Sequence, residues 1–174
     1  MKTYIEISVP IRYNAHWFES LRTVLNNVNV RWQKGYYHIT MAFMDETAEG
    51  VDWKQILDRH FSQTAAFEMT FDKIDVFTSR PGKHIINLTA TQVPQRFLSL
   101  VEDIRNEMVN AGCKIQSSFK LHVTLGRASF PDFKLLKIRE IIETVTLPQL
   151  SLTLTEVDFR VFRGPVIYET SLSK

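Results

Sequence analysis

The sequence predicts an α+β fold of two similar lobes that share one cleft. Some segments alternate apolar and polar residues, as β-strands do, and between them lie segments whose apolar residues recur at helical spacing. A short motif, His-x-Thr, occurs at residues 38–40 and again at 122–124, and the elements expected around its two copies follow in the same order. No Gly/Ser-rich or Pro-rich linker separates the copies, so we expect residues 1–174 to form one bilobal domain.

The first half of the chain alternates strand and helix patterns. Ile5, Ile7 and Val9 predict an opening strand that ends at Pro10. The elements expected next are a helix over about 17–28, a strand over about 36–43, a helix over 53–61 capped by Asp52, a strand over 67–71 that continues through 74–78, a turn at 79–82 and a returning strand at 85–88.

The second half repeats this order. A helix follows Pro94 and ends at Gly112, and the strand with the second motif comes next. Asp132 is then expected to cap a helix over about 135–142, before a strand over about 150–162, a turn at 163–165 and a returning strand. The repeat units therefore span roughly 11–90 and 94–173, and the opening strand is an addition to one sheet. A pseudo-twofold axis would bring the two motif strands face to face.

The composition is that of an ordinary globular protein. The content of hydrophobic residues is 44%, which is enough for a substantial core, and the formal net charge is only +2. Such a small charge argues against a DNA-coating protein, so any contact with nucleic acid should be local. No apolar run could span a bilayer, and Glu6 interrupts the place of a signal sequence. The single cysteine, Cys113, excludes an intrachain disulfide, and we expect a cytoplasmic protein without membrane contact.

The two motifs place a histidine and a threonine on the same side of a strand. Because side chains alternate along a strand, His38 and Thr40 project together, and so do His122 and Thr124. The apolar residues between them project the other way and can enter a core under helices. The His/Thr face of each strand is therefore free to line a groove.

Two histidines at one groove suit acid–base chemistry on a phosphate. An unperturbed imidazole has a pKa of about 6.5, so one ring can accept a proton while the other donates one. Threonine hydroxyls can donate hydrogen bonds to the phosphate oxygens. One His-x-Thr motif alone is weak evidence, but two copies in equivalent positions favour a functional pair. The default interpretation of His16, His60 and His84 is packing, because they lack this context.

The sequence gives little support for a metal site. Two histidines without a third carboxylate or thiol ligand make an incomplete zinc site, and Asp45 and Glu46 fit a solvated strand end. No G-x-S-x-G sequence indicates a serine nucleophile. We therefore expect neither a metal nor another cofactor.

The paired motifs resemble those of a known superfamily. His38-Ile-Thr-Met-Ala-Phe and His122-Val-Thr-Leu-Gly-Arg are similar to the H-x-T-h motifs of the 2H phosphoesterases, and most closely to the 2′-5′ RNA ligase branch. The resemblance covers most of the chain, although Met41 replaces a more common Leu. It implies two pseudo-symmetric lobes, each with an antiparallel sheet and helices on its outer face, with an active-site cleft between the lobes.

The resemblance also implies an activity and roles for the site residues. Members commonly open 2′,3′-cyclic phosphate ends of RNA or nucleotides to 2′-phosphates without a metal. By position, His38 would donate a proton to the leaving 3′ oxygen, and His122 would accept the proton of the attacking water. Thr40 and Thr124 would hold the phosphate. Arg127 matches a basic residue of several members, although strict alternation would place it on the wrong face of its strand.

Two alternative functions remain at this stage. One is 2′-5′ joining of RNA ends, and the other is a nucleotide- or RNA-binding module with little turnover. The expected partners are RNA ends or small cyclic nucleotides, and we expect a monomer because one chain supplies both halves of the site. The aromatic residues that could stack on a base are Tyr13, Tyr36 and Phe119, and the cations beside the motifs include Lys34 and Lys120.

Overall fold

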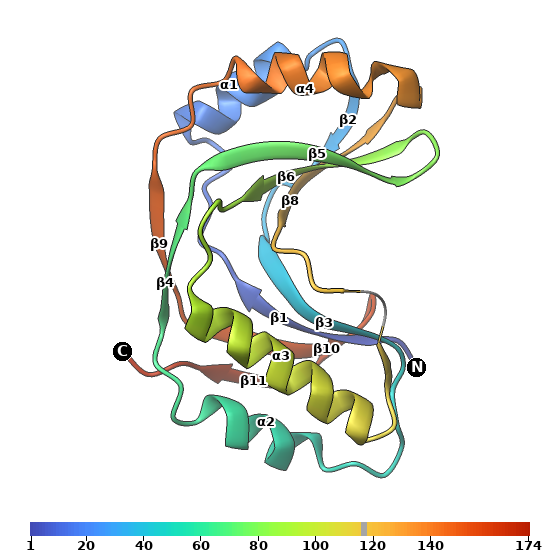
Figure 1. The fold of residues 1–174 in the computed structure, drawn as a ribbon, viewed down its shortest axis with the longest axis vertical. Coiled ribbons are helices and arrows are strands. Elements are labelled where there is room, and N and C mark those ends of the chain that lie inside the picture. Colours follow the sequence, from blue (N-terminus) through green and yellow to red (C-terminus); the bar gives the residue numbers. More distant parts are fainter. Residues whose placement is uncertain (116–117) are drawn as a thin grey trace.

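Two antiparallel sheets face each other in the computed structural model, which describes residues 1–115 and 118–174 (Figure 1). The first is a five-stranded sheet. Its order is β11 (Val166–Ser171), β10 (Glu156–Val161), β1 (Thr3–Ser8), β3 (His38–Glu46) and β7 (Lys114–Ile115).

The second is a four-stranded sheet that contains the other motif strand. Its order is β2 (Asn29–Trp32), β8 (Val123–Ser129), β6 (Lys83–Thr89) and β5 (Lys73–Arg80). A separate pair, β4 (Phe67–Phe71) and β9 (Leu150–Leu154), runs between the two sheets at the left of Figure 1.

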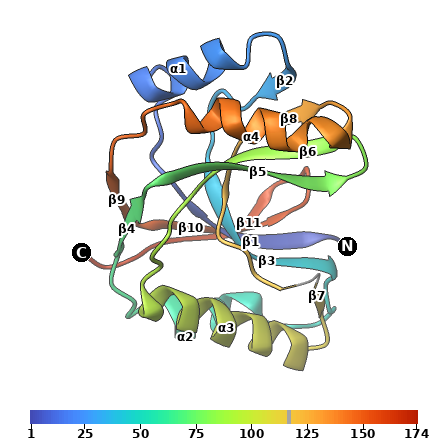
Figure 2. The same cartoon turned by 45° about the horizontal axis from the view of Figure 1, so that its top comes forward.

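Helices cover the outer face of each sheet, as Figures 1 and 2 show. The four-stranded sheet lies under α1 (His16–Val24) and α4 (Leu135–Glu143), and the five-stranded sheet packs on α2 (Trp53–Phe61) and α3 (Gln95–Asn110). Each helix buries one apolar stripe against its sheet. The predicted α+β fold with two antiparallel sheets is therefore confirmed, and the inner faces of the sheets are left to form a cleft.

Each sheet combines strands from both repeat units, whereas the repeat in the sequence predicted one lobe per unit. The first motif strand, β3, shares a sheet with the hairpin β10–β11, and the second, β8, shares a sheet with β5–β6. This exchange of hairpins between the two repeat units accompanies the pairing of β4 with β9, in which Met69 lies opposite Leu152. Each half of the chain passes through this pair into the other lobe. The expected continuous strand over 67–78 is consequently two strands, interrupted at Asp72.

Several element boundaries differ from the expectations. The short edge strands β2 and β7 carry little sequence signal and were not anticipated. Asp52 caps α2 as predicted, because its side chain accepts a hydrogen bond from the Gln55 N–H. Asp132 does not cap α4. It begins a short 3-10 helix, η1 (Asp132–Lys134), and its carboxylate accepts a hydrogen bond of 2.8 Å from the Gly82 N–H in the β5–β6 turn.

Gly126 allows β2 to pack closely against the second motif strand. A Cβ at this buried position would lie 2.8 Å from Val30 Cγ1 and 2.9 Å from Trp32 Cε3. Both neighbours lie on β2, which pairs with β8 through Trp32 and Gly126. A larger residue would push β2 away from the strand that carries His122.

We expect Gly126→Ala to destabilise the protein by about 1–3 kcal/mol, the usual cost of overpacking a close contact. Chemical denaturation measures this loss. Gly35→Ala is the matched control, because no atom lies within 4 Å of the position of its Cβ. Equal stability of the two variants would contradict the prediction.

Candidate active site

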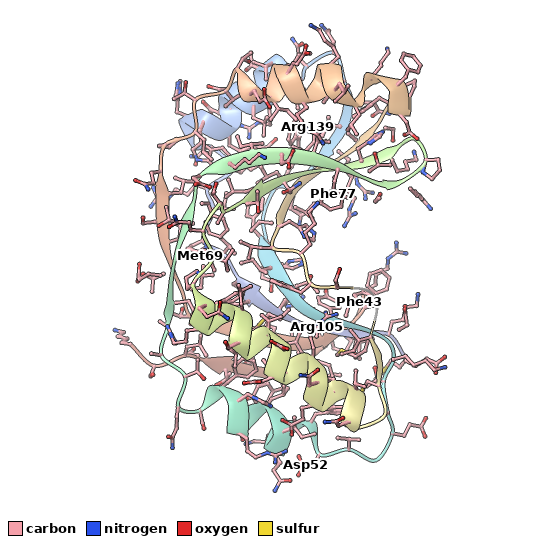
Figure 3. The ribbon with its side chains drawn as sticks, viewed as in Figure 1. Phe43, Asp52, Met69, Phe77, Arg105 and Arg139 are labelled. Carbon is pink, nitrogen blue, oxygen red and sulfur yellow. The ribbon has the colours of Figure 1, made fainter. Side chains whose placement is uncertain are left out.

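Residues from both motifs line one cavity between the two sheets. Strands β3 and β8 contact each other directly, and Thr40 and His122 both border a cavity of about 350 Å³. Phe43 on β3 and Phe77 on β5 border it from opposite sheets, and Figure 3 shows these two side chains on either side of the opening. The remaining lining residues are Arg105, Ser118, Phe119 and Lys120.

The first motif strand has a β-bulge directly after its threonine. Opposite β1, Glu6 pairs with Thr40 and Ile5 pairs with Ala42, so Met41 is an extra residue. The bulge shifts the alternation by one position. Phe43, five residues after the histidine, therefore joins the His/Thr face.

The second motif strand has the same irregularity at the equivalent place. Opposite β6, Thr124 pairs with Asn87 and Gly126 pairs with Ile86, so Leu125 is the extra residue. Leu125 and Gly126 are both buried, whereas Arg127 is exposed. The bulge thus places Arg127 on the same face as Thr124, which strict alternation would not do.

The hydrogen bond of His122 fixes which ring nitrogen carries the proton, and burial favours the neutral ring. Its Nδ1 lies 2.9 Å from the Lys120 carbonyl oxygen, and because a carbonyl only accepts, Nδ1 must carry the proton. The ring also meets the edge of Phe77 at 5.3 Å between centroids. Burial, supported by the charges of Lys120 and Arg127, lowers the pKa of His122, while the hydrogen bond to Lys120 partly opposes this shift. The Nε2 lone pair is suited to accept a proton.

His38 lies among aromatic rings and positive charges. Its ring stacks on Tyr4 and is tilted against Tyr36, at centroid distances of 6.2 and 5.2 Å. Burial, followed by the charge of Arg160, lowers the pKa of His38 to about 4. His122 and Arg127 act in the same direction, so the charges of the two motif strands influence each other across the cleft.

A buried carboxylate lies directly behind His38. Glu6 is 0% exposed, and its Oε2 lies 3.3 Å from His38 Nε2. Tyr36 donates a hydrogen bond to Oε1, and Arg160 Nε lies 2.9 Å from the same oxygen. Arg160 also bonds Asp158 at 2.8 Å. Burial raises the pKa of Glu6 to about 6, against the opposing effects of Tyr36 and Arg160.

This network was not among the site residues predicted from the sequence, where Glu6 counted only against a signal sequence. The available signal was an acidic residue between two buried isoleucines, on the strand face opposite to theirs. Which strand would lie beside β1 was unknown, and so were the partners Tyr36 and Arg160.

The aromatic candidates occupy different places. Phe119 borders the cavity, whereas the Tyr36 hydroxyl is engaged by Glu6, and Tyr13 packs against Phe18 and under the Arg22 guanidinium. Phe43 and Phe77 were not among the sequence candidates. Lys120 lies over the Phe77 ring at 3.9 Å, whereas Lys34 is exposed and does not border the cavity.

His60 and His84 have structural partners, and His16 is exposed on α1. His60 bonds Glu107, and buried His84 bonds Thr78 and the Phe130 carbonyl. Over residues 1–115 and 118–174, no group of three or more His, Cys, Asp and Glu side chains is placed to hold a metal ion. Within the same residues, no helix is both long and apolar enough to cross a membrane.

Comparison with known proteins identifies the family. The sequence profile of the 2′-5′ RNA ligase superfamily matches residues 15–165. The chain belongs to this superfamily. Its fold resembles a crystal structure described as a phosphoesterase, with a TM-score of 0.62, 20% identity and 99% of both chains covered.

Two further proteins of known structure share this architecture. Escherichia coli LigT complexed with NADP⁺ aligns at a TM-score of 0.60 and 20% identity, over 99% of this chain and 98% of that one. Kluyveromyces marxianus Usb1 aligns at 0.61 and 13% identity, over 98% of both chains. The resemblance to the 2H phosphoesterases that the motifs indicated is confirmed at the level of superfamily and fold.

The position of Arg160 leads to a prediction about proton affinity. An NMR titration of the ligand-free protein should give His38 a pKa of about 4, below the usual 6.5. Arg160→Gln should raise the pKa of His38, because it removes a cation that disfavours the protonated ring. It should also raise the pKa of Glu6, which Arg160 lowers.

Lys137→Gln, on the exposed surface of α4, is the control with the same change of charge and should leave both pKa values unaltered. An unchanged His38 titration in Arg160→Gln would show that Arg160 does not set the proton affinity of this ring.

Proposed function

We propose that the protein is a metal-independent cyclic phosphodiesterase that opens 2′,3′-cyclic phosphate ends of RNA or nucleotides to 2′-phosphates. The observation that carries the proposal is the convergence of Thr40, on β3, and His122, directly before β8 of the other sheet, on one cavity. His38 shares the strand face of Thr40, and its proton affinity depends on the charge of His122. His122 lines this cavity and His38 does not, so the proposal requires the phosphate to lie at the Thr40 side, within reach of both imidazoles.

The tautomer of His122 supports its role as the proton acceptor. With Nδ1–H held by the Lys120 carbonyl, Nε2 takes a proton from water while the water oxygen attacks phosphorus. The bond from phosphorus to the 3′ oxygen then breaks. His38 gives its proton to that oxygen, and the products are a 2′-phosphate and a free 3′-hydroxyl.

The negative charge of the substrate would favour the protonated form of His38, which the proton donor needs. In the ligand-free protein, burial and nearby cations disfavour the protonated ring. A bound phosphodiester adds a negative charge that opposes those cations, and the Glu6 carboxylate adds another from behind. Both charges favour the imidazolium that must donate the proton.

The remaining motif residues would bind the phosphate. The hydroxyls of Thr40 and Thr124 can donate to nonbridging oxygens, and Arg127 adds a guanidinium on the same strand face as Thr124. Structures of Escherichia coli LigT complexed with 3′-AMP and with phosphate support a phosphate ligand for this fold. The member described as a phosphoesterase supports the same reaction class.

His38→Ala and His122→Ala test the acid–base pair. Each should lower kcat/KM for a nucleoside 2′,3′-cyclic phosphate by about a hundredfold to ten-thousandfold, because each removes one proton-transfer group. The wild type should keep its activity in EDTA. His16→Ala, on the exposed surface of α1, is the matched control and should behave as the wild type. Full activity of either motif variant would refute the mechanism.

Product analysis separates the proposal from its alternatives. A 3′-phosphate product would reverse the donor and acceptor roles of His38 and His122. Joined RNA ends, without hydrolysis, would identify an end-joining enzyme. Tight binding of the cyclic phosphate without any product would identify a binding module.

Thr40→Val and Thr124→Val test the phosphate contacts. Each removes a hydroxyl at nearly constant side-chain volume, and kcat/KM should fall by about ten- to a hundredfold, which corresponds to one hydrogen bond to a charged group. Steady-state kinetics on the same cyclic nucleotide measure the loss. Thr23→Val on α1 is the control, because its hydroxyl bonds only the Glu19 carbonyl on the helix surface. Unchanged kinetics in both motif variants would exclude the hydroxyls as phosphate ligands.

A further inference from the structure

The inner face of the four-stranded sheet has a second cavity beside the first. Its volume is about 430 Å³, and four basic side chains line it. Arg31 comes from β2, Arg127 from β8, and Arg80 and Lys83 from the β5–β6 hairpin. We call it the basic cavity. No carboxylate is among its lining residues in the described part of the chain.

The pairing of the strands places these cations on the same face of the four-stranded sheet. Arg31 lies directly opposite Arg127, so both side chains project to the same side of the sheet. Lys83 lies opposite Ser129 and donates a hydrogen bond of 2.9 Å to its hydroxyl. Because of the bulge at Leu125, this side is also that of the second motif. The basic cavity therefore continues the strand face that begins at the candidate active site.

The guanidinium groups of the basic cavity lack balancing charges. Within residues 1–115 and 118–174, Arg31, Arg80 and Arg127 form no ion pair with a carboxylate, although Arg139 and Arg160 do. Burial and the charge of Arg31 both lower the pKa of Arg127. Like charges on directly opposed residues cost free energy when nothing balances them, and a bound polyanion would reduce that cost.

We propose that the basic cavity binds the phosphodiester backbone of the nucleotides that precede the reacting end, so that the substrate is an RNA strand and not a mononucleotide. This inference rests on the proposed function for the reacting end itself. A cyclic phosphate terminates the 3′ end, so the strand can extend only in the 5′ direction. Arg31 and Arg80 suit this ligand, because a guanidinium binds phosphate oxygens with two parallel hydrogen bonds.

The two cavities together match the requirements of single-strand binding. Such proteins combine a basic groove along the backbone with aromatic rings that stack on bases. Phe43, Phe77 and Phe119 border the first cavity, where the terminal nucleotide would lie, and the cations border the second. The basic cavity recognises a series of successive phosphates. An RNA backbone supplies such a series, and so does a nucleoside polyphosphate.

The test compares oligonucleotide binding with mononucleotide turnover in the double variant Arg31→Gln/Arg80→Gln. Fluorescence anisotropy measures binding of a single-stranded RNA of about eight nucleotides with a 3′-phosphate end, a length within the usual site sizes. We expect Kd to increase at least tenfold. The slope of log affinity against log salt should become shallower by about 1.4, for two lost phosphate contacts. The kcat/KM for a nucleoside 2′,3′-cyclic phosphate should stay at the wild-type value.

Lys134→Gln/Lys137→Gln is the control with the same change of net charge, since both lysines are exposed in η1 and α4. It should bind the RNA as the wild type does. Thermal unfolding of Arg31→Gln/Arg80→Gln should match or exceed the wild-type midpoint, because the substitutions remove like charges.

Three outcomes would overturn the inference. The arginine variant could bind RNA with wild-type affinity, or its kcat/KM for the mononucleotide could fall by the same factor as its RNA affinity. It could also lose binding of tripolyphosphate while it still binds RNA. The last would assign the basic cavity to a polyphosphate. The binding assay needs no turnover, so an inactive wild type that binds RNA through Arg31 and Arg80 would refute only the proposed function.

Discussion

The antiparallel pairing of β4 with β9 is the interaction on which the arrangement of the site depends. Phe67, Met69 and Phe71 of β4 are fully buried, so this short pair is anchored in the core between the two lobes. Through it, the chain that leaves α2 enters the four-stranded sheet, and the chain that leaves α4 enters the five-stranded one. Neither sheet is complete without the other half of the chain, and the two motif strands are consequently held face to face.

The bulges after Thr40 and Thr124 then determine what shares the cleft with the histidines. An unbroken strand would place Phe43 and Arg127 among the buried residues of the opposite face, where a charged guanidinium without a partner would strongly destabilise the fold. The extra residue in each strand turns both side chains inward and leaves Met41 and Leu125 buried. An aromatic ring and a guanidinium thus occupy equivalent positions in the two halves, so the pseudo-symmetric scaffold carries an asymmetric site.

The two histidines also differ in electrostatic surroundings, although their motifs are nearly identical. A backbone carbonyl fixes the tautomer of His122, whereas His38 faces the Glu6 carboxylate and the Arg160 guanidinium. The difference comes from the strands on one side of β3, because Glu6 lies on β1 and Arg160 on β10, whereas β6 lies beside β8. These two strands therefore supply the charges that distinguish a proton donor from a proton acceptor in the proposed mechanism.

The sequence by itself determined most of the elements, the repeated order and the residues of the paired motifs, because alternation, helical periodicity and the cap at Asp52 are local properties. Only the tertiary structure decided which strands share a sheet, because the pairing of β4 with β9 joins segments about eighty residues apart. It also decided the inward position of Arg127, since a bulge is defined against the partner strand and leaves no mark in the strand's own residues. The charged network of Glu6 and the basic cavity around Arg31 depend on the same long-range pairings.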